Sequence, residues 1–277
     1  MKLLLHTCCA PCSGAIIERL CAEGVKPMLF WSNSNIFTPE ENFRRLDVLH
    51  NYAANFGVPL VIDEYSHEEW LEFQKHNLPD APENYPERSE RCLNCFKFRL
   101  LRAARYGVAN GFDTLATSLA SSRWKSLEQV EEAGNWACAR ACGLPAAATS
   151  PAGEQAVSRA GAMADAAKSA FLRQSERCPV GQKDAGTPQN AVPESGAKIE
   201  FWARNWRKGG LQERRNEIIR EQNFYNQNFC GCEFSFAEAQ SRLSEAVPQN
   251  EDNRSGEQVS PPKGAAASEN RELKRNN

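Results

Sequence analysis

The sequence predicts an α/β protein built on a mostly parallel sheet. Short apolar runs of strand length alternate with amphipathic segments of ten or more residues, and glycine, proline or polar residues separate them. Parallel strands need long crossover connections, which helices supply, so this alternation is typical of βαβ units. A chain of 277 residues can hold one sizeable domain of this kind together with appendages.

Each expected element has a local reason. The first strand contains the run Leu3, Leu4 and Leu5, the helix after it carries apolar residues at helical spacing and ends near Gly24, and Pro39 suits the first turn of the next helix. The predicted strands cover residues 2–7, 27–31, 58–62, 114–119 and 198–202. The predicted helices cover residues 13–23, 39–56, 67–76, 91–111, 211–223 and a segment that begins at a cap in 121–122 and ends near 133.

The composition divides the chain into three parts. Residues 143–196 are rich in Ala, Gly, Ser, Pro and Gln with few large apolar side chains, which predicts a low-complexity insertion that is largely disordered or weakly helical. Residues 247–277 are polar without a core pattern and predict a disordered tail. Residues 1–142 and 197–246 are then expected to form one α/β domain.

Charge and hydropathy exclude some classes of protein. The net charge is −2, so any contact with nucleic acid must come from a local basic patch. No apolar run approaches 18 residues, so we expect no membrane span. The apolar stretch at the start is too short for a secretion signal, and we expect a cytoplasmic protein.

Eleven cysteines in such a chain indicate metal or redox chemistry rather than disulfides. Two cysteines three residues apart at a helix start face the same side, and Gly231 relaxes the backbone between two nearly adjacent sulfurs. A helix N-terminus also lowers the pKa of nearby thiols. Seven cysteines lie in three groups at predicted element boundaries: Cys8, Cys9 and Cys12; Cys92 and Cys95; Cys230 and Cys232.

The number of grouped cysteines exceeds the need of one centre. Thiolate sets bind iron–sulfur clusters or zinc, and either a cubane cluster or a structural zinc takes four cysteines. The other three could hold a second, coordinatively open metal, or two of them could act as a redox pair.

Basic and aromatic residues suggest a second site. Arg204, Arg207 and Lys208 flank Trp206 in a loop without acids, while Arg123 and Lys125 follow the fourth strand. Cations bind phosphates and an indole stacks on an unpaired base, as in single-stranded RNA recognition. The charged helix at 211–221 is better explained as a solvated face, because glutamates alternate with its arginines.

Polar residues follow the second strand as well. Asn33 and Asn35 lie in the loop after it, and Glu41 lies on the next helix. The carboxyl ends of parallel strands usually border the ligand crevice, so these side chains are candidates for substrate contact or, alternatively, for loop and cap formation.

Several motifs together resemble a known family, the epoxyqueuosine reductases of the QueH type. They are H-x-C-C-A-P-C at residues 6–12, N-x-N-I at 33–36, E-R-C-x-x-C at 90–95, S-x-x-x-K at 121–125, N-W-R-K-G-G at 205–210 and Q-x-x-C-G-C at 227–232. The resemblance covers residues 1–142 and 198–235. It implies a Rossmann-like fold similar to nucleotide-hydrolase and thiolation domains, a 4Fe–4S cluster beside a single iron ion, and reduction of epoxyqueuosine to queuosine in the anticodon of tRNA.

The chain departs from the family pattern at three places, one of which is the segment at 143–196, expected to have no counterpart in the family. In the family segment N-P-N-I-H-P, this chain has Ser34, Phe37 and Thr38 in place of the first proline, the histidine and the last proline. Position 12, which is Cys or Asp among relatives, is Cys12 here. An all-sulfur protein shell is therefore one possibility for the second iron, and a different third ligand is the other.

The resemblance and the residues suggest one mechanism. A reduced carrier protein would supply electrons through the cluster, the open metal would take the epoxide oxygen, and two electrons with two protons would give alkene and water. A metal-bound water, Tyr225 or Glu41 could donate the last proton. One alternative is a cluster-containing tRNA thiolation enzyme. Such an enzyme should have a glycine-rich loop after the first strand, but residues 8–13 at that place contain no glycine. The other alternative is a non-catalytic metal-binding module, which would not need the loop of tryptophan and arginine residues.

Overall fold

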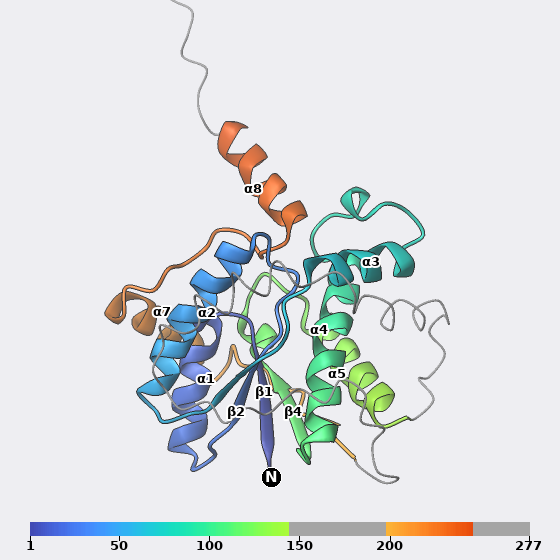
Figure 1. Ribbon diagram of the computed structural model, residues 1–277. Helices are drawn as coiled ribbons and strands as arrows, with labels where there is room; N and C mark the ends of the chain where they lie inside the picture. The colour runs from blue at the N-terminus through green and yellow to red at the C-terminus, as the bar shows by residue number, and fades with distance from the viewer. Residues whose placement is uncertain (144–197, 246–277) are drawn as a thin grey trace, which may run out of the picture.

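The computed structural model describes residues 1–143 and 198–245, and within them five parallel strands form one sheet in the order β3-β2-β1-β4-β5 (Figure 1). The α/β prediction is confirmed. The central strand β1 is buried along its whole length, and Leu5 lies opposite Leu29 on one side and Ala116 on the other. The strands are β1 Leu3–Thr7, β2 Met28–Trp31, β3 Leu60–Ile62, β4 Thr114–Thr117 and β5 Glu200–Phe201.

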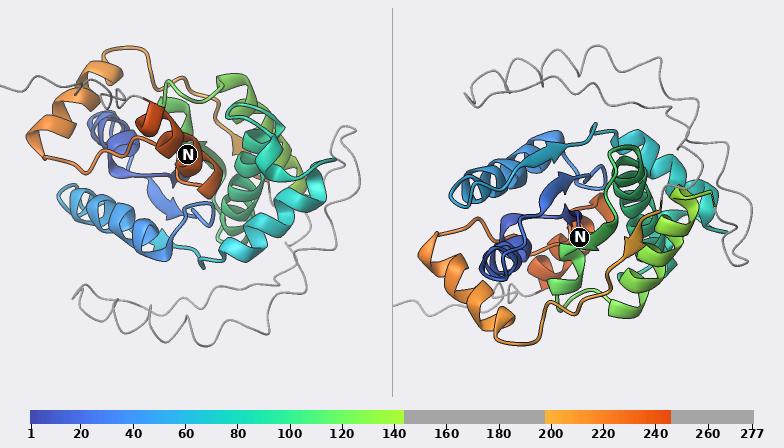
Figure 2. Two further views of the ribbon diagram at one scale, coloured as in Figure 1. Left: turned by 90° about the horizontal axis from the view of Figure 1, so that it is seen from above. Right: turned by 90° about the horizontal axis from the view of Figure 1, so that it is seen from below.

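Helices cover both faces of the sheet. α1, α2 and α7 lie on one face and α4 and α5 on the other, with the sheet between the two layers in the view from below (Figure 2). α3 and α8 lie at the end of the molecule toward which the strands point (Figure 1). The helices are α1 Ala10–Ala22, α2 Pro39–Ala54, α3 His67–Asn77, α4 Glu90–Ala109, α5 Leu127–Ala141, α7 Leu211–Glu221 and α8 Glu233–Glu245, with the short 3-10 helices η1 Pro82–Asn84 and η2 Ser118–Ser121.

Helix α1 begins earlier than the sequence predicts. It starts at Ala10 rather than at residue 13, with Cys9 as its N-cap residue and Pro11 in its first turn. Proline is well suited there because its missing N–H would have no partner in a first turn. Cys12 therefore lies on the helix itself.

The segment after β4 also differs from the prediction. The strand ends at Thr117, whose hydroxyl accepts a bond from the Leu119 amide at 3.2 Å and starts η2. Ser121 does not cap a helix; its hydroxyl donates to the carbonyls of Ser118 and Cys12, both at 2.9 Å. Ser126 caps α5 instead, which leaves residues 122–125 as a loop beside the first cysteines.

The sequence does not predict α8, which follows Cys232 directly. No helix in the described ranges is long and apolar enough to span a membrane. Almost all of the predicted insertion (143–196) and tail (247–277) lies outside the described residues. The predicted division of the chain into a domain, an insertion and a tail therefore stays a prediction.

Candidate metal centre

The first cysteine group lies where β1 gives way to α1. Cys8, Cys9 and Cys12 are buried, and their three sulfurs lie within 4.8 Å of one another. The Ser118 hydroxyl donates to the Cys8 sulfur at 3.4 Å and accepts from the Cys8 amide at 3.0 Å, which links the group to the end of β4. Three soft donors at this separation could hold one thiophilic metal ion and leave part of its coordination shell open.

Electrostatics favour a thiolate in this group. Hydrogen bonds from Cys8 and Cys9 lower the pKa of Cys12, and the positive charges of Lys125 and Arg215 act in the same direction. The same sulfur–sulfur bonds, together with burial, raise the pKa of Cys9. The surroundings of the trio therefore favour a thiolate at Cys12.

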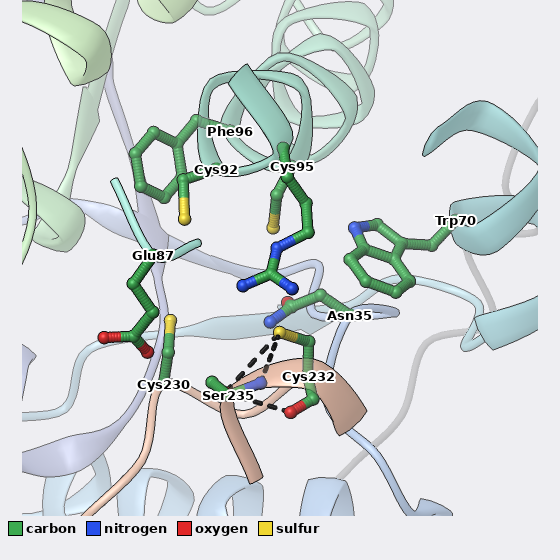
Figure 3. Close-up of a pocket in the computed structure, with 10 residues that line it drawn as sticks. Asn35, Trp70, Glu87, Cys92, Cys95, Phe96, Cys230, Cys232 and Ser235 are labelled. Carbon is green, nitrogen blue, oxygen red and sulfur yellow. Dashed lines mark hydrogen bonds between the residues drawn. The ribbon is translucent and has the colours of Figure 1, made fainter. Parts of the chain in front are cut away.

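The other four grouped cysteines line a single cavity (Figure 3). Cys92 and Cys95 lie at the start of α4, and Cys230 and Cys232 immediately precede α8. The sulfurs of the two pairs point toward one another across this cavity. The remaining lining residues are Asn35, Trp70, Glu87, Arg91, Phe96 and Ser235. The topology thus sorts the seven cysteines into a set of four and a set of three.

Three of the four thiols in this cavity lose a proton less readily than an ordinary cysteine, because burial disfavours the thiolate. Burial, with the neighbouring sulfurs, raises the pKa of Cys92 to about 12 and that of Cys232 to about 12. Burial also raises the pKa of Cys95, to about 11. A metal that binds here must displace these protons, as it does at any buried thiolate site.

Arg91 is a residue of this cavity that the sequence reasoning did not assign. Its side chain is 2% exposed and pairs with Glu238 of α8 at 3.2 Å, and its Nε has no hydrogen-bond partner in the part of the chain that the structure describes. A buried guanidinium beside four sulfurs offsets the charge that the deprotonated cysteines acquire. Its position directly before Cys92 is the feature of the sequence that could have indicated a place beside the cysteines.

Gly231 brings the C-terminal pair into place. Its φ of +139° is unfavourable for other residues, and a Cβ there would lie 3.0 Å from Nη1 of Arg45 and 3.1 Å from Cγ1 of Ile36. Its carbonyl accepts a bond from the Phe37 amide at 2.8 Å. The sequence-based role of this glycine, to let two nearly adjacent sulfurs converge, agrees with this geometry.

The two cysteine sets are neighbours. Burial lowers the pKa of Lys125, but the charges of Cys230, Cys8 and Cys12 together raise it more, so its ammonium lies within electrostatic reach of both sets.

His6 is not a candidate ligand: it is fully buried, with Nδ1 2.8 Å from the Thr117 hydroxyl and Nε2 3.2 Å from a backbone carbonyl.

The two asparagines after β2 have different surroundings. Asn33 is buried, donates to the carbonyl of Thr7 at 2.9 Å and accepts from Arg99, which favours a positioning role over substrate contact. Asn35 lines the four-cysteine cavity, and its Oδ1 has no hydrogen-bond partner among the described residues. Of the two, Asn35 is therefore the one that presents an unpaired polar group to the candidate site.

The prediction that a base stacks on Trp206 is wrong. The indole is 2% exposed and belongs to the main hydrophobic core, with Trp202 against its edge at 5.6 Å between ring centroids. Arg204 lies over the Trp206 ring at 4.6 Å, and its guanidinium pairs with Glu23 at 3.0 Å. Alternation of aromatic and basic residues cannot distinguish a stacking surface from a tryptophan with an arginine covering it.

The other predicted basic residues lie around the loop at 122–125. Arg207 donates to the carbonyls of Ser122 and Lys125, the latter at 2.7 Å, and so supports the loop. Arg123 is exposed, and its guanidinium lies 4.8 Å from the centroid of the exposed Trp124 ring.

Tyr225 and Glu41 are brought together, although 184 positions separate them. The Tyr225 hydroxyl lies 3.2 Å from both carboxylate oxygens of Glu41, and Nε of the buried Arg45 donates to Glu41 at 2.7 Å. Nη1 of Arg45 also donates to the carbonyl of Cys230, so this pair is connected to the four-cysteine cavity.

Comparison with known proteins identifies the family. The model of the family described as epoxyqueuosine reductase QueH matches residues 3–174 and 185–238, which is most of the chain. The chain belongs to the QueH family. The match includes residues 143–174 and 185–196, so the expectation that the segment at 143–196 has no counterpart in the family is wrong.

Curated QueH proteins align over most of their own length. The epoxyqueuosine reductase QueH of Acinetobacter baylyi is 31% identical over 234 residues, covering 84% of this chain and 80% of that protein. Those of Histophilus somni and Haemophilus influenzae are 30% and 29% identical, covering 84% and 86% of this chain and 72% and 73% of theirs.

Proposed function

We propose that this QueH protein reduces epoxyqueuosine in tRNA to queuosine, using a 4Fe–4S cluster and an adjacent iron ion. The name of its relatives supports the reaction. The observation that carries the proposal for the metals is the division of seven cysteines into a cavity of four and a buried trio at the same end of the sheet.

The residues of the larger set suit a cubane cluster. Four cysteines are the usual ligand number of such a cluster, and these four come from two helix starts that face one another. The buried guanidinium of Arg91, which lines the cavity together with the Trp70 indole, would offset the charge of the thiolates. We assign Cys92, Cys95, Cys230 and Cys232 to this cluster.

The trio suits the second iron. Cys8, Cys9 and Cys12 offer three sulfurs within 4.8 Å, so a four-coordinate metal there would have one position left for a substrate oxygen. When bound, the cluster supplies single electrons and the open iron acts as a Lewis acid toward the epoxide oxygen. Lys125, near both sets, would stabilise negative charge between them.

The chain's own residues would handle the protons. The reaction takes up two electrons and two protons, breaks two C–O bonds and releases water, leaving an alkene. Tyr225 is the proton donor that we favour, because its hydroxyl hydrogen-bonds to Glu41 and the ion pair of Glu41 with Arg45 holds that carboxylate in place. A reduced carrier protein would supply the electrons.

The tRNA would approach the basic loop at 122–125, at this end of the sheet. Arg123, Lys125 and Arg207 lie together around that loop, close to the trio of cysteines. Such a cluster of cations attracts phosphate groups although the net charge of the protein is −2. Asn35, with its unpaired oxygen in the four-cysteine cavity, would contact the modified nucleoside.

The test is anaerobic purification followed by iron and sulfide analysis, and incubation of the reduced protein with epoxyqueuosine-containing tRNA. We expect more than four irons per chain, about four sulfides as one cubane requires, and queuosine as the nucleoside found by mass spectrometry after digestion. Stoichiometric zinc without sulfide would exclude the redox mechanism. A thiolated nucleoside formed in the presence of ATP would favour the thiolation enzyme instead.

A further inference from the structure

One tryptophan of this protein faces solvent beside the candidate site. Trp124 is 64% exposed, whereas Trp31, Trp70 and Trp206 are buried and the remaining two of the six are half-buried. It lies in the loop at 122–125, between η2 and α5. An exposed indole of this size is unusual on a protein surface and frequently marks a binding site.

The loop that carries Trp124 is supported at every backbone carbonyl. Nε of Arg88 donates to the carbonyl of Trp124 at 2.9 Å, and its Nη2 donates to that of Arg123 at 3.4 Å. Arg207 donates to the carbonyls of Ser122 and Lys125. Two arginines from distant segments thus fix four successive peptide groups. A surface ordered before binding loses less conformational entropy on binding.

The loop is also strongly cationic. Arg88, Arg123, Lys125 and Arg207 converge on it, and residues 118–127 contain no acid. The Arg123 guanidinium lies 4.8 Å from the Trp124 ring centroid. It forms no ion pair within residues 1–143 and 198–245, so it can bind a phosphate without breaking one. An aromatic face with surrounding cations fits an unpaired nucleotide.

The position of the loop connects it with the chemistry. It directly follows η2, in which Ser118 bonds to the Cys8 sulfur and Ser121 donates to the Cys12 carbonyl at 2.9 Å. A base on Trp124 would therefore lie next to a nucleoside that reaches the trio of cysteines.

We propose that Trp124 is a stacking platform for an unpaired base of the RNA, adjacent to the nucleoside that reacts. This inference rests on the proposed tRNA substrate and adds the surface that reads its single-stranded loop. A carrier protein is the other conceivable occupant, but stacking on a π-face and phosphate binding both favour RNA here.

The test is the affinity of the metal-loaded protein for a fluorescently labelled anticodon stem-loop RNA, measured by anisotropy. Trp124→Ala should weaken binding about tenfold or more, whereas Trp124→Phe should recover most of the affinity because it keeps an aromatic face. The matched control is Ile62→Ala, which removes a side chain that is 45% exposed on the edge strand β3, and it should bind like the wild type. Iron content should stay the same in all three variants.

The salt dependence supplies a second measurement. Arg123→Gln should weaken RNA binding and reduce the slope of log K against log[salt] by about 0.7, the value for one phosphate contact on a single strand. Trp124→Ala should leave that slope unchanged, because stacking releases no counterion.

Equal RNA affinity of Trp124→Ala and wild type would overturn the inference, whether or not the wild type reduces the modified nucleoside. Impaired reduction by a carrier protein with unchanged RNA affinity would overturn it too and assign the surface to that protein. Conversely, Trp124-dependent RNA binding by a protein that never forms queuosine would support the surface and refute the proposed reaction.

Discussion

Arg45 and Cys230 lie 185 positions apart, yet Nη1 of Arg45 donates to the Cys230 carbonyl at 3.0 Å. The same guanidinium binds Glu41 through Nε and lies 5.0 Å from the ring centroid of Phe229. The C-terminal cysteine pair is thus fixed to α2 through its backbone, and the glycine between the two cysteines lies directly against Arg45.

Gly231→Ala should displace this pair. The added methyl would meet the Arg45 guanidinium and Ile36 at a φ that alanine strongly disfavours, so we expect lower iron and sulfide content and lower activity. Gly209→Ala is the matched control, since Gly209 also has a positive φ but a methyl added there would meet no atom within 4 Å. Equal losses in both variants would mean that backbone strain, and not contact with Arg45, is the cause.

Single cysteine variants should separate the two centres. Cys95→Ser should lose the visible absorption of the cluster and all activity, because it removes one of four ligands. Cys12→Ser should keep that absorption and the sulfide content but lose activity and the iron above four per chain. Cys138→Ser, in the buried face of α5, should change neither metal content nor spectrum. Loss of sulfide in Cys12→Ser would contradict the division into four and three.

Trp206→Ala should destabilise the protein, whereas Trp124→Ala should hardly change its stability. Removing the buried Trp206 side chain should lower the free energy of unfolding by about 3–5 kcal/mol, because it leaves a large cavity in the core. Removing the exposed Trp124 should change that free energy by about 0.5 kcal/mol or less. Denaturant titration of both variants measures this, and a fully stable Trp206→Ala protein would contradict the burial of that indole.

Tyr225→Phe tests the proton donor. The variant keeps the ring but not the hydroxyl that bonds to Glu41, so kcat should fall about 10²- to 10⁴-fold while metal content stays the same. Tyr52→Phe is the control, since it removes a hydroxyl that donates to Glu18 of α1 and not to Glu41. An unchanged kcat in Tyr225→Phe would leave Glu41 or a water as the donor.

The ion pair between α1 and α7 should make stability depend on pH. Hydrogen bonds from Arg214, and then from Tyr52, lower the pKa of Glu18 below its ordinary 4.5. A folded-state pKa below the unfolded one stabilises the fold above pH 4.5, and this stabilisation is lost as the pH falls through the lowered value.

Urea unfolding of wild type and Glu18→Gln at several pH values measures the effect. The wild type should be more stable by about 1 kcal/mol at neutral pH, a modest value because solvent screens the pair. The difference should disappear in acid. A difference that is the same at neutral and acid pH would mean that packing, and not charge, accounts for it.

The sequence by itself determined the class of fold and the places where chemistry can occur. The alternation of strands and helices, the buried first strand and the proline at the start of α1 follow from local periodicity and capping, which depend on neighbours within a few residues. The three cysteine groups were visible for the same reason, since each one is a short motif at an element boundary.

Only the tertiary structure decided which groups work together. Spacing along the chain carries no information on whether Cys230 and Cys232 meet α4 or α1, because that depends on contacts such as Arg91 with Glu238, 147 positions apart. Exposure is decided in the same way. Trp206 and Trp124 both adjoin arginines in the sequence, but packing against the core buries the first, and the arginine-supported loop leaves the second in solvent.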